Sequence, residues 1–266
     1  MTSATSSAVG CGAAGPRPDV SDVVPRFGSR FLVLWVAGVA SVVLVLPYAL
    51  TLQRKVLETI PAPLPAIVLA SLAQSAVLLV LAVLVGLRAA DAVGLRTPLT
   101  NAIAARANVR EAFAGLRPAS AAAVGIATAV LVSGLDALVF RPLVPGFQEA
   151  VATVAPSRVE GLLASFYGGI GEEILTRLFL VSVIAWILRG RATWLAVVIA
   201  AVLFAAGHLP AAATVSPLTP ALVARIVVLN SLAGIAFGWL YWRRGLEAAM
   251  AAHFSADLVL HVVVGG

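Results

Sequence analysis

The sequence predicts an all-α fold, a polytopic bundle of about seven membrane-spanning helices. Of its 266 residues, 61% are hydrophobic and only 11% are charged, whereas about a quarter of the residues of a soluble domain are charged. The mean hydropathy is +1.03. Several apolar runs reach the ~20 residues that a helix needs to cross a bilayer. This composition indicates a membrane protein.

The chain divides into three expected parts. Residues 1–30 are rich in Ser, Gly, Ala and Pro and should form a disordered cytoplasmic tail. Residues 31–150 should hold the N-terminal spanning helices with a basic cytoplasmic loop, and residues 155–264 should hold the helices of a catalytic core. No cleavable signal is visible, so the first spanning helix should act as the insertion signal. The single cysteine, Cys11, excludes an internal disulfide and a cysteine-based metal site.

Prolines and charged residues bound the apolar runs that should span the membrane. Three prolines between residues 61 and 65 open the second run, and Pro210 should end the fifth. The "RRG" at 243–245 should form the turn before the last run. Between the second and third runs, residues about 100–114 fit an interfacial helix. The seven expected spans are 31–52, 64–87, 119–140, 162–188, 192–209, 220–242 and 246–264.

Positive charge alternates along the loops. The loops after the second, fourth and sixth runs carry an excess of arginine, whereas the loop after the third is balanced and the loop after the fifth has no charge. Because cytoplasmic loops hold the excess of Lys and Arg, we expect a multi-pass protein of the cell membrane with its N-terminus in the cytoplasm and its C-terminus outside. Arg54 and Lys55 are the weak exception. The net charge of +6 therefore reflects topology; membrane lipid is an expected partner and nucleic acid is not.

The stretch "GGIGEEILTRLFL", residues 168–180, places three ionisable side chains inside an apolar run. A carboxylate at the centre of a spanning helix costs about 2.5–3.5 kcal/mol on insertion scales. Glu173 and Arg177 are four residues apart, share a helix face and should form an ion pair. Glu172 lies about 100° away around the helix and has no partner in its own segment. For Glu172 a function is therefore favoured over a purely structural role.

All three histidines of the chain lie in or at the end of C-terminal apolar runs. His253, Asp257 and His261 are spaced by four residues and should line one stripe of the last helix. Phe204 and His208 are likewise one turn apart. These side chains and the glutamates should gather around one hydrated space, because each is costly to leave unpaired in lipid.

The side-chain types indicate hydrolysis with water as the nucleophile. Glutamate can act as a general base on water, and histidines can polarise a carbonyl, hold a metal or stabilise an oxyanion. One Glu with two His also matches a hydrolytic zinc site in ligand type. A serine or cysteine nucleophile lacks a setting, since Cys11 lies in the tail and Ser255 cannot face its neighbour His253 on a helix.

Three motifs resemble those of the CPBP family, which comprises CAAX-type prenyl endopeptidases and bacteriocin-processing or immunity proteins and is also called the Abi family. The "EEILTR" at 172–177 resembles the motif EExxxR, the "FAAGH" at 204–208 resembles FxxxH, and the "HFSAD" at 253–257 resembles HxxxN or HxxxD. They occur in this order in separate apolar segments. The resemblance covers residues about 155–264.

The resemblance implies an intramembrane endopeptidase that acts on a membrane-associated peptide or protein. Glu172 would be the base that activates water, with His208 assisting. His253 and Asp257 would bind the oxyanion or position the water. The same four residues are the candidate zinc ligands of a metalloprotease, and they fit a metal-free glutamate protease equally. The residues that would orient this set are Glu173, Arg177 and Phe204.

Asp257 stands where many relatives have Asn. An ionised Asp would repel an oxyanion, so it would have to be protonated, paired with His253 or His261, or bound to a metal. Counted at 1.5 Å per residue from the expected cytoplasmic helix ends, Glu172 and His208 lie ~24 Å deep and His253 only ~10 Å. His261 is closer in level to Glu172 and is kept as a supporting candidate. The helices are therefore tilted or broken, or their boundaries differ.

Two other function classes fit parts of the pattern. One is a non-catalytic immunity factor or scaffold with the same fold. The other is a small transporter or proton relay that uses Glu172 and the histidines. Transporters commonly contain duplicated halves, and no such repeat is evident in the sequence.

Overall fold

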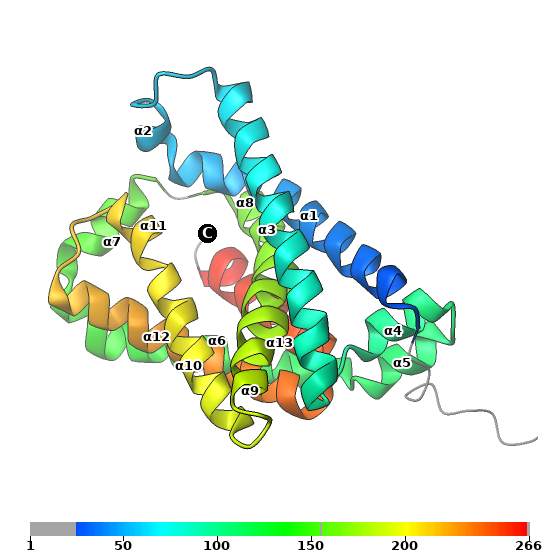
Figure 1. Ribbon diagram of the computed structural model, residues 1–266. Coiled ribbons are helices and arrows are strands. Elements are labelled where there is room, and N and C mark those ends of the chain that lie inside the picture. Colours follow the sequence, from blue (N-terminus) through cyan, green and yellow to red (C-terminus); the bar gives the residue numbers. More distant parts are fainter. Residues whose placement is uncertain (1–24, 155, 265–266) are drawn as a thin grey trace, which may run out of the picture.

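The computed structural model describes residues 25–154 and 156–264, and in these ranges all regular structure is helical. Six helices of the described ranges are long and apolar enough to cross a membrane. Figure 1 shows them as an irregular bundle with short helices at its edges. This confirms an all-α, polytopic bundle, and the protein is a multi-pass membrane protein.

The N-terminal half contains three of these long helices. The first begins at Phe27 and not at the expected residue 31, so the last residues of the expected tail are helical; residues 1–24 of that tail lie outside the described residues. The elements are α1 (Phe27–Leu52), α2 (Arg54–Leu57), α3 (Leu64–Val93), α4 (Pro98–Ala105), α5 (Val109–Gly115), α6 (Pro118–Leu135), the π-helical turn η2 (Asp136–Phe140), the 3₁₀ turn η3 (Arg141–Leu143) and α7 (Pro145–Ala152).

The expected interfacial helix at about 100–114 is wrong in one respect. Two short helices, α4 and α5, replace it. Arg106 follows α4 with a φ of 53°, in the left-handed region. An L-residue pays a steric cost there and cannot continue a right-handed helix, so the chain turns and begins again at Asn108, whose side chain caps α5.

The C-terminal half consists of shorter segments with frequent π-helical geometry. They are α8 (Arg158–Phe166), η4 (Tyr167–Glu172), η5 (Ile174–Val181), α9 (Ser182–Ile187), α10 (Thr193–Gly207), α11 (Leu209–Ala213), α12 (Pro220–Arg244), α13 (Leu246–Asp257) and the π-helical end η6 (Leu258–Val264).

The fourth expected span is continuous but is not a regular α-helix. Residues 158–187 stay helical throughout, and their centre, 167–181, is π-helical apart from Glu173. Because Glu172, Glu173 and Arg177 lie at its centre, it is more charged than the six long apolar helices and is not among them. Its glycines allow close contacts: a Cβ on Gly169 would lie 2.8 Å from the Cβ of Phe254, and one on Gly171 would lie 2.8 Å from Ser41 Oγ. Single π turns inside helices are frequent at functional sites.

The expected stop of the fifth span at Pro210 is also wrong. The α-helix α10 ends at Gly207, but the chain turns at His208 and remains helical through Pro210 to Ala213. Pro210 lies in the first turn of α11, where its missing N–H leaves no intrahelical bond unmade.

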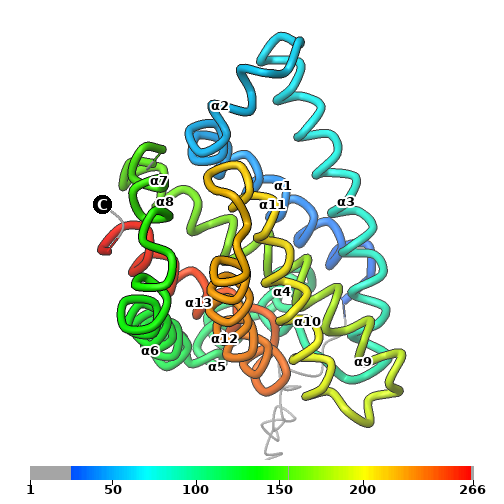
Figure 2. Tube along the Cα trace, turned by 90° about the vertical axis from the view of Figure 1, so that its left-hand side faces the viewer, coloured from blue at the N-terminus to red at the C-terminus, as the bar shows by residue number. Residues whose placement is uncertain are grey.

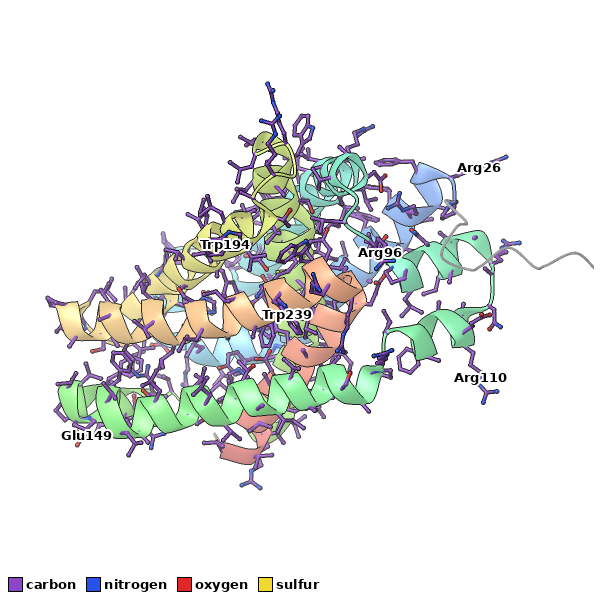
Figure 3. All side chains as sticks on the ribbon, turned by 90° about the horizontal axis from the view of Figure 1, so that it is seen from below. Arg26, Arg96, Arg110, Glu149, Trp194 and Trp239 are labelled. Atoms are coloured by element: carbon purple, nitrogen blue, oxygen red, sulfur yellow. The ribbon has the colours of Figure 1, made fainter. Side chains whose placement is uncertain are left out.

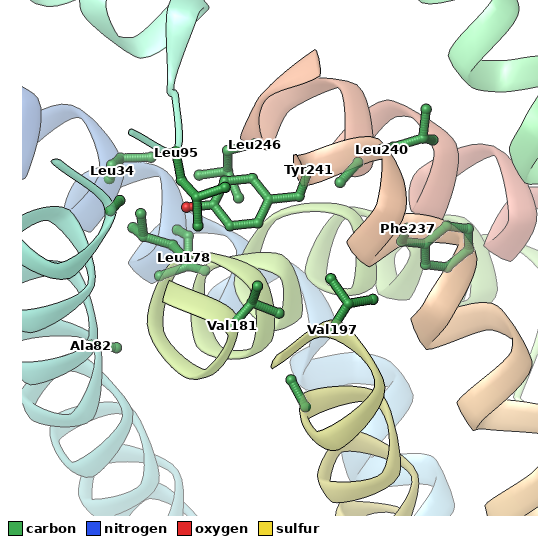
Figure 4. Close-up of a cluster of buried hydrophobic side chains, with 14 of the residues drawn as sticks. Leu34, Ala82, Leu95, Leu178, Val181, Val197, Phe237, Leu240, Tyr241 and Leu246 are labelled. Atoms are coloured by element: carbon green, nitrogen blue, oxygen red, sulfur yellow. The ribbon is translucent and has the colours of Figure 1, made fainter. Parts of the chain in front are cut away.

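One buried apolar cluster joins both halves of the chain. Leu34 of α1, Ala82 of α3, Leu178 of η5, Val197 of α10 and Phe237 of α12 belong to this cluster and are labelled in Figure 4. The N-terminal helices α1 and α3 therefore pack directly against η4 and η5, the segments that carry the glutamates and Arg177.

Small residues set the closest helix contacts. A Cβ on Gly238 of α12 would lie 2.6 Å from Val197 of α10, two helices that lie side by side in Figure 2. A Cβ on Gly125 of α6 would collide with the carbonyl of Ala252. Figure 3 shows α13 passing α6 obliquely. This oblique path brings the first half of α13 into the centre of the bundle.

Candidate active site

The three motifs meet at the centre of the bundle. The π-helical segments η4 and η5 bring the glutamates and the arginine, α10 brings Phe204, and α13 brings His253 and Asp257. All of these segments contact one another in pairs or through shared neighbours. Three regions that are far apart in the sequence, residues 167–181, α10 and α13, thus supply one cluster of charged and aromatic side chains.

Glu173 and Arg177 form the predicted ion pair. Arg177 Nη1 lies 3.1 Å from Glu173 Oε1, and the two side chains are 2% and 0% exposed. Two opposite charges buried this deeply compensate each other. The sequence prediction for this pair is confirmed, although the segment between the two residues is π-helical.

The guanidinium of Arg177 is held on several sides. Nη2 donates to the carbonyl of Gly234 at 3.1 Å, and Nη1 donates to the hydroxyl of Thr176. The guanidinium carbon faces the rings of Phe204 at 5.1 Å and Phe237 at 5.6 Å. Cation–π contacts of this kind are strongest where water is excluded, so Arg177 has essentially one available position.

His253 is fixed by Glu173 and by a stacked ring. Its Nδ1 lies 2.7 Å from Glu173 Oε1. Its imidazole stacks on Phe237, with the centroids 4.7 Å apart and the planes 25° apart, and meets Phe204 edge-on at 6.0 Å. With the Nδ1 hydrogen donated to Glu173, Nε2 is directed away from it. That nitrogen lies 3.8 Å from Glu172 Oε2 and 3.6 Å from Asp257 Oδ1.

The two adjacent glutamates have different environments. The side chain of Glu173 is 0% exposed, whereas that of Glu172 is 23% exposed. The main chain at Glu172 is restrained, since its carbonyl accepts a hydrogen bond from Thr176 Oγ1 at 2.6 Å. Glu172 is therefore the carboxylate that water and a reactant can reach, and Glu173 is the one that supports His253.

Asp257 lies between two histidines. Its Oδ1 is 3.6 Å from His253 Nε2 and 4.0 Å from His261 Nε2, which confirms that these three residues share one stripe. The geometry matches the paired state among the alternatives for this residue. A Cβ on Gly168 would collide with the Asp257 carboxylate and lie 3.3 Å from His253 Nε2, so the glycine leaves room for this arrangement.

His208 is the predicted site residue that stands apart. It lies in the turn between α10 and α11, where Nδ1 is 2.9 Å from the carbonyl of Phe204 and the two rings meet edge-on at 4.6 Å. Within the described ranges it makes no hydrogen bond or ion pair with Glu172, His253 or Asp257. Phe204 separates it from His253.

The donor arrangement does not fit a zinc site. Among the residues that the structure describes, no three His, Cys, Asp or Glu side chains are grouped so that they could hold a metal ion. Of the four candidate ligands, Glu172, His253 and Asp257 adjoin one another, but His208 is turned toward Phe204. A two-histidine site would need His208 to move.

Sequence reasoning missed three aromatic residues of the site. Phe237 stacks on His253; Tyr48 of α1 packs edge-on against His261, with centroids 5.6 Å apart; and Tyr167 lies close enough to Glu172 to interact with its charge. The chain has only three tyrosines, and two of them are in apolar runs beside the site. Because tyrosine is rare in this chain, these two could have been singled out from the sequence. No neighbouring residue distinguishes Phe237 from the other phenylalanines.

The sequence predicted that His253 lies less deep in the membrane than Glu172, but the structure places the two side chains at the same level. Their side chains are adjacent, because α13 crosses the bundle obliquely and the segment around Glu172 is π-helical. His261 is also close to this level, since it reaches Asp257.

We expect Phe237→Leu to free the His253 ring and to lower the free energy of unfolding by about 1 kcal/mol, the range of aromatic pairs. With only three histidines in the chain, labelled imidazole resonances report this directly. Those of His253 should shift and broaden. Phe31→Leu, which removes the stacked Phe31–Trp35 pair on α1, is the control and should leave them unchanged. Unaltered His253 resonances in Phe237→Leu would contradict the inferred restraint.

Comparison with known proteins gives one family match. Residues 154–259 match the family model of the Rce1-like type II CAAX prenyl endopeptidases. No curated protein and no solved structure matches the chain. The matched range contains all three motifs and every residue of the cluster except Tyr48 and His261.

Proposed function

From the match of residues 154–259 to the model of this CAAX-type membrane protease family, we propose that the protein is an intramembrane endopeptidase in which Glu172 activates water. The substrate class is a membrane-associated peptide or a membrane protein. The observation that carries the proposal is the contrast between the two glutamates: Glu172 is partly exposed beside His253 and Asp257, while Glu173 is buried and paired.

The chemistry begins with a water molecule between Glu172 and the substrate carbonyl. Glu172 accepts a proton from this water as the oxygen attacks the carbonyl carbon, and the carbonyl π electrons move onto its oxygen. Protonated His253 donates Nε2–H to that oxyanion, as oxyanion-binding donors do in acyl transfer. The proton on Glu172 then passes to the amide nitrogen, the oxyanion electrons re-form the C=O bond as the C–N bond breaks and the amine leaves, and the carboxylate of Glu172 is regenerated.

The surrounding side chains hold Glu172 and His253 in place. Glu173 accepts the Nδ1–H of His253 and so aims Nε2 at the reaction space. Arg177 neutralises Glu173, and Phe204 covers the guanidinium. Asp257, between the two histidines, positions the water or His253. Such preorganised contacts matter because misplacement by 1 Å can cost about 10²-fold in rate.

His208 assists at the edge of this set. Its Nδ1–H donates to the carbonyl of Phe204, which leaves Nε2 free. We place this nitrogen on the substrate side of Phe204, where it would accept a hydrogen bond from the N–H of a bound peptide and help to position it. His208→Ala should lower cleavage less than substitution of Glu172 does, because no proton of the water passes through it.

The proposed topology follows the basic ends of the helices. The helix α12 ends in Arg243 and Arg244, and the turn after α9 carries Arg189 and Arg191. Because an excess of arginine marks cytoplasmic loops, we place these ends and the N-terminus in the cytoplasm of a cell whose surface membrane holds the protein. With the helical stretch 158–187 as a seventh span, the C-terminus lies outside.

The test is a cleavage assay and a metal analysis on one purified sample. The full chain, reconstituted in nanodiscs, is incubated with a mixture of peptides and small membrane proteins, and the products are identified by mass spectrometry. We expect defined cleavage without stoichiometric metal and without inhibition by chelators. Loss of cleavage on metal removal would overturn the metal-free mechanism. Absence of cleavage, with protection of a partner protein intact, would favour the immunity or scaffold function.

Gly168→Ala should lower cleavage by about 10²-fold, because the added methyl group displaces Asp257 and His253. The matched control is Gly134→Ala in α6, where a Cβ meets nothing within 4 Å. Alanine is preferred to glycine inside helices by about 0.5–1 kcal/mol, so the control should be as stable as the wild type or more so, with full activity. Equal rates for the two variants would contradict this packing role.

A further inference from the structure

An arginine-rich hairpin, residues 96–117, projects from the side of the bundle. It contains α4 and α5 and joins the end of α3 to the start of α6, two helices long and apolar enough to span the membrane. Figure 1 shows it beside the first residues of α1, at the end of the bundle where α3 ends. Since it connects two spans, both of its ends lie at the same membrane face.

Hydrogen bonds attach the α4 part of the hairpin to the bundle, whereas α5 is exposed. The N–H of Thr100 donates to Glu247 Oε1 at 2.7 Å, and the N–H of Leu246 donates to the carbonyl of Arg96 at 3.0 Å. These bonds fix α4 against the start of α13. In contrast, α5 has no buried residue. The bundle therefore holds α5 out to one side.

Its positive charge is not neutralised within the protein. The nearby acids are already engaged: Asp91 binds the buried Arg30 through both oxygens at 2.8 and 2.9 Å, and Glu111 accepts a hydrogen bond from Asn108 at 3.1 Å. In the part of the chain that the structure describes, no ion pair is made by the exposed side chains of Arg96, Arg106, Arg110 and Arg117. Figure 3 shows Arg110 pointing away from the bundle.

Apolar side chains are exposed among these arginines. Ile103 is 42% exposed, Val109 41% and Phe113 49%. A surface with both features matches the boundary of an anionic membrane, where apolar groups enter the acyl region and arginines meet phosphates. An acidic protein would satisfy the arginines but has no reason to lie at the membrane face to which the two spans confine this hairpin.

We propose that the hairpin 96–117 binds the headgroups of anionic phospholipids, with Val109 and Phe113 inserted beside them. The inference is independent of proteolysis, since the hairpin is hydrogen-bonded to Leu246 and Glu247, which lie outside the three motifs. Its consequence is that the protein selects anionic lipids around α4 and α5 and that α5 lies along the membrane surface.

The test measures the association of spin-labelled phosphatidylglycerol, relative to spin-labelled phosphatidylcholine, with the full-length protein in phosphatidylcholine bilayers. We expect Arg106→Gln/Arg110→Gln to lower the preference for phosphatidylglycerol by about 25-fold, since each basic residue near the surface contributes about a five-fold factor. Phe113→Ser, with all charges kept, should lower it by about two- to three-fold.

The control removes the same charge elsewhere at this end of the bundle. Arg189→Gln/Arg191→Gln, in the turn after α9, should change the preference by less than two-fold. Melting temperatures in detergent confirm that each variant is folded. An equal fall in the two double variants would overturn the proposal in favour of a general charge effect. An unchanged preference for phosphatidylglycerol in Arg106→Gln/Arg110→Gln would also overturn the proposal. The same holds if this variant loses only the binding of a polyglutamate peptide, which is the probe for an acidic protein partner.

Discussion

Glu172→Gln is expected to lower the rate of peptide cleavage by about 10³-fold, within the 10²–10⁴-fold range of general-base catalysis. The amide has the shape of the carboxylate but cannot accept a proton from water. Because Glu172 is partly exposed and Glu173 carries the buried ion pair, the substitution should leave the bundle intact. The measurement is the rate of product formation with the purified full chain, beside its melting temperature.

The control for this prediction is Glu149→Gln, which removes an exposed carboxylate of α7 outside the site. It should cleave at the wild-type rate. Full activity of folded Glu172→Gln would exclude Glu172 as the base. If the wild type cleaves nothing while Glu172→Gln retains partner protection, the non-catalytic function is supported.

Arg177→Met should lower the free energy of unfolding by about 3–5 kcal/mol, the cost of removing one partner of a buried ion pair. The methionine fills much of the space between Phe204 and Phe237, so the loss comes mainly from the charge left on Glu173. That carboxylate is fully buried, and its Oε2 already has no hydrogen-bond partner among the residues that the structure describes. Unfolding in mixed micelles, followed by circular dichroism, measures the change.

The exposed ion pair Arg54–Glu58 is a matched control for the buried ion pair Glu173–Arg177. Arg54 and Glu58 are also four residues apart, at 3.3 Å, but their side chains are 81% and 64% exposed. Arg54→Met should be indistinguishable from the wild type, since surface ion pairs contribute little. The double variant Glu173→Gln/Arg177→Met should recover part of the stability but not the cleavage, because the amide supports His253 less well than the carboxylate. Equal effects of Arg177→Met and Arg54→Met would contradict the burial argument.

The membrane-bundle fold and several contacts of the candidate site were predictable from local pattern. Apolar runs of spanning length located the six long helices and the stretch 158–187 to within a few residues, because hydrophobic length is a direct consequence of bilayer thickness. The spacing of four residues correctly paired Glu173 with Arg177 and aligned His253, Asp257 and His261.

Other features depended on contacts between distant parts of the chain, which no short stretch of the sequence indicates. The amino-acid sequence determined which side chains share a helix face and which are too polar for lipid, since both follow from residue spacing and transfer free energy. Only the tertiary structure decided that His253 bonds Glu173 and stacks on Phe237, that His208 stays behind Phe204, and that π-helical turns bring α13 level with Glu172. These outcomes depend on how separate helices cross, and crossing is set by the complementary packing of many distant small and large residues, not by any short stretch of the chain.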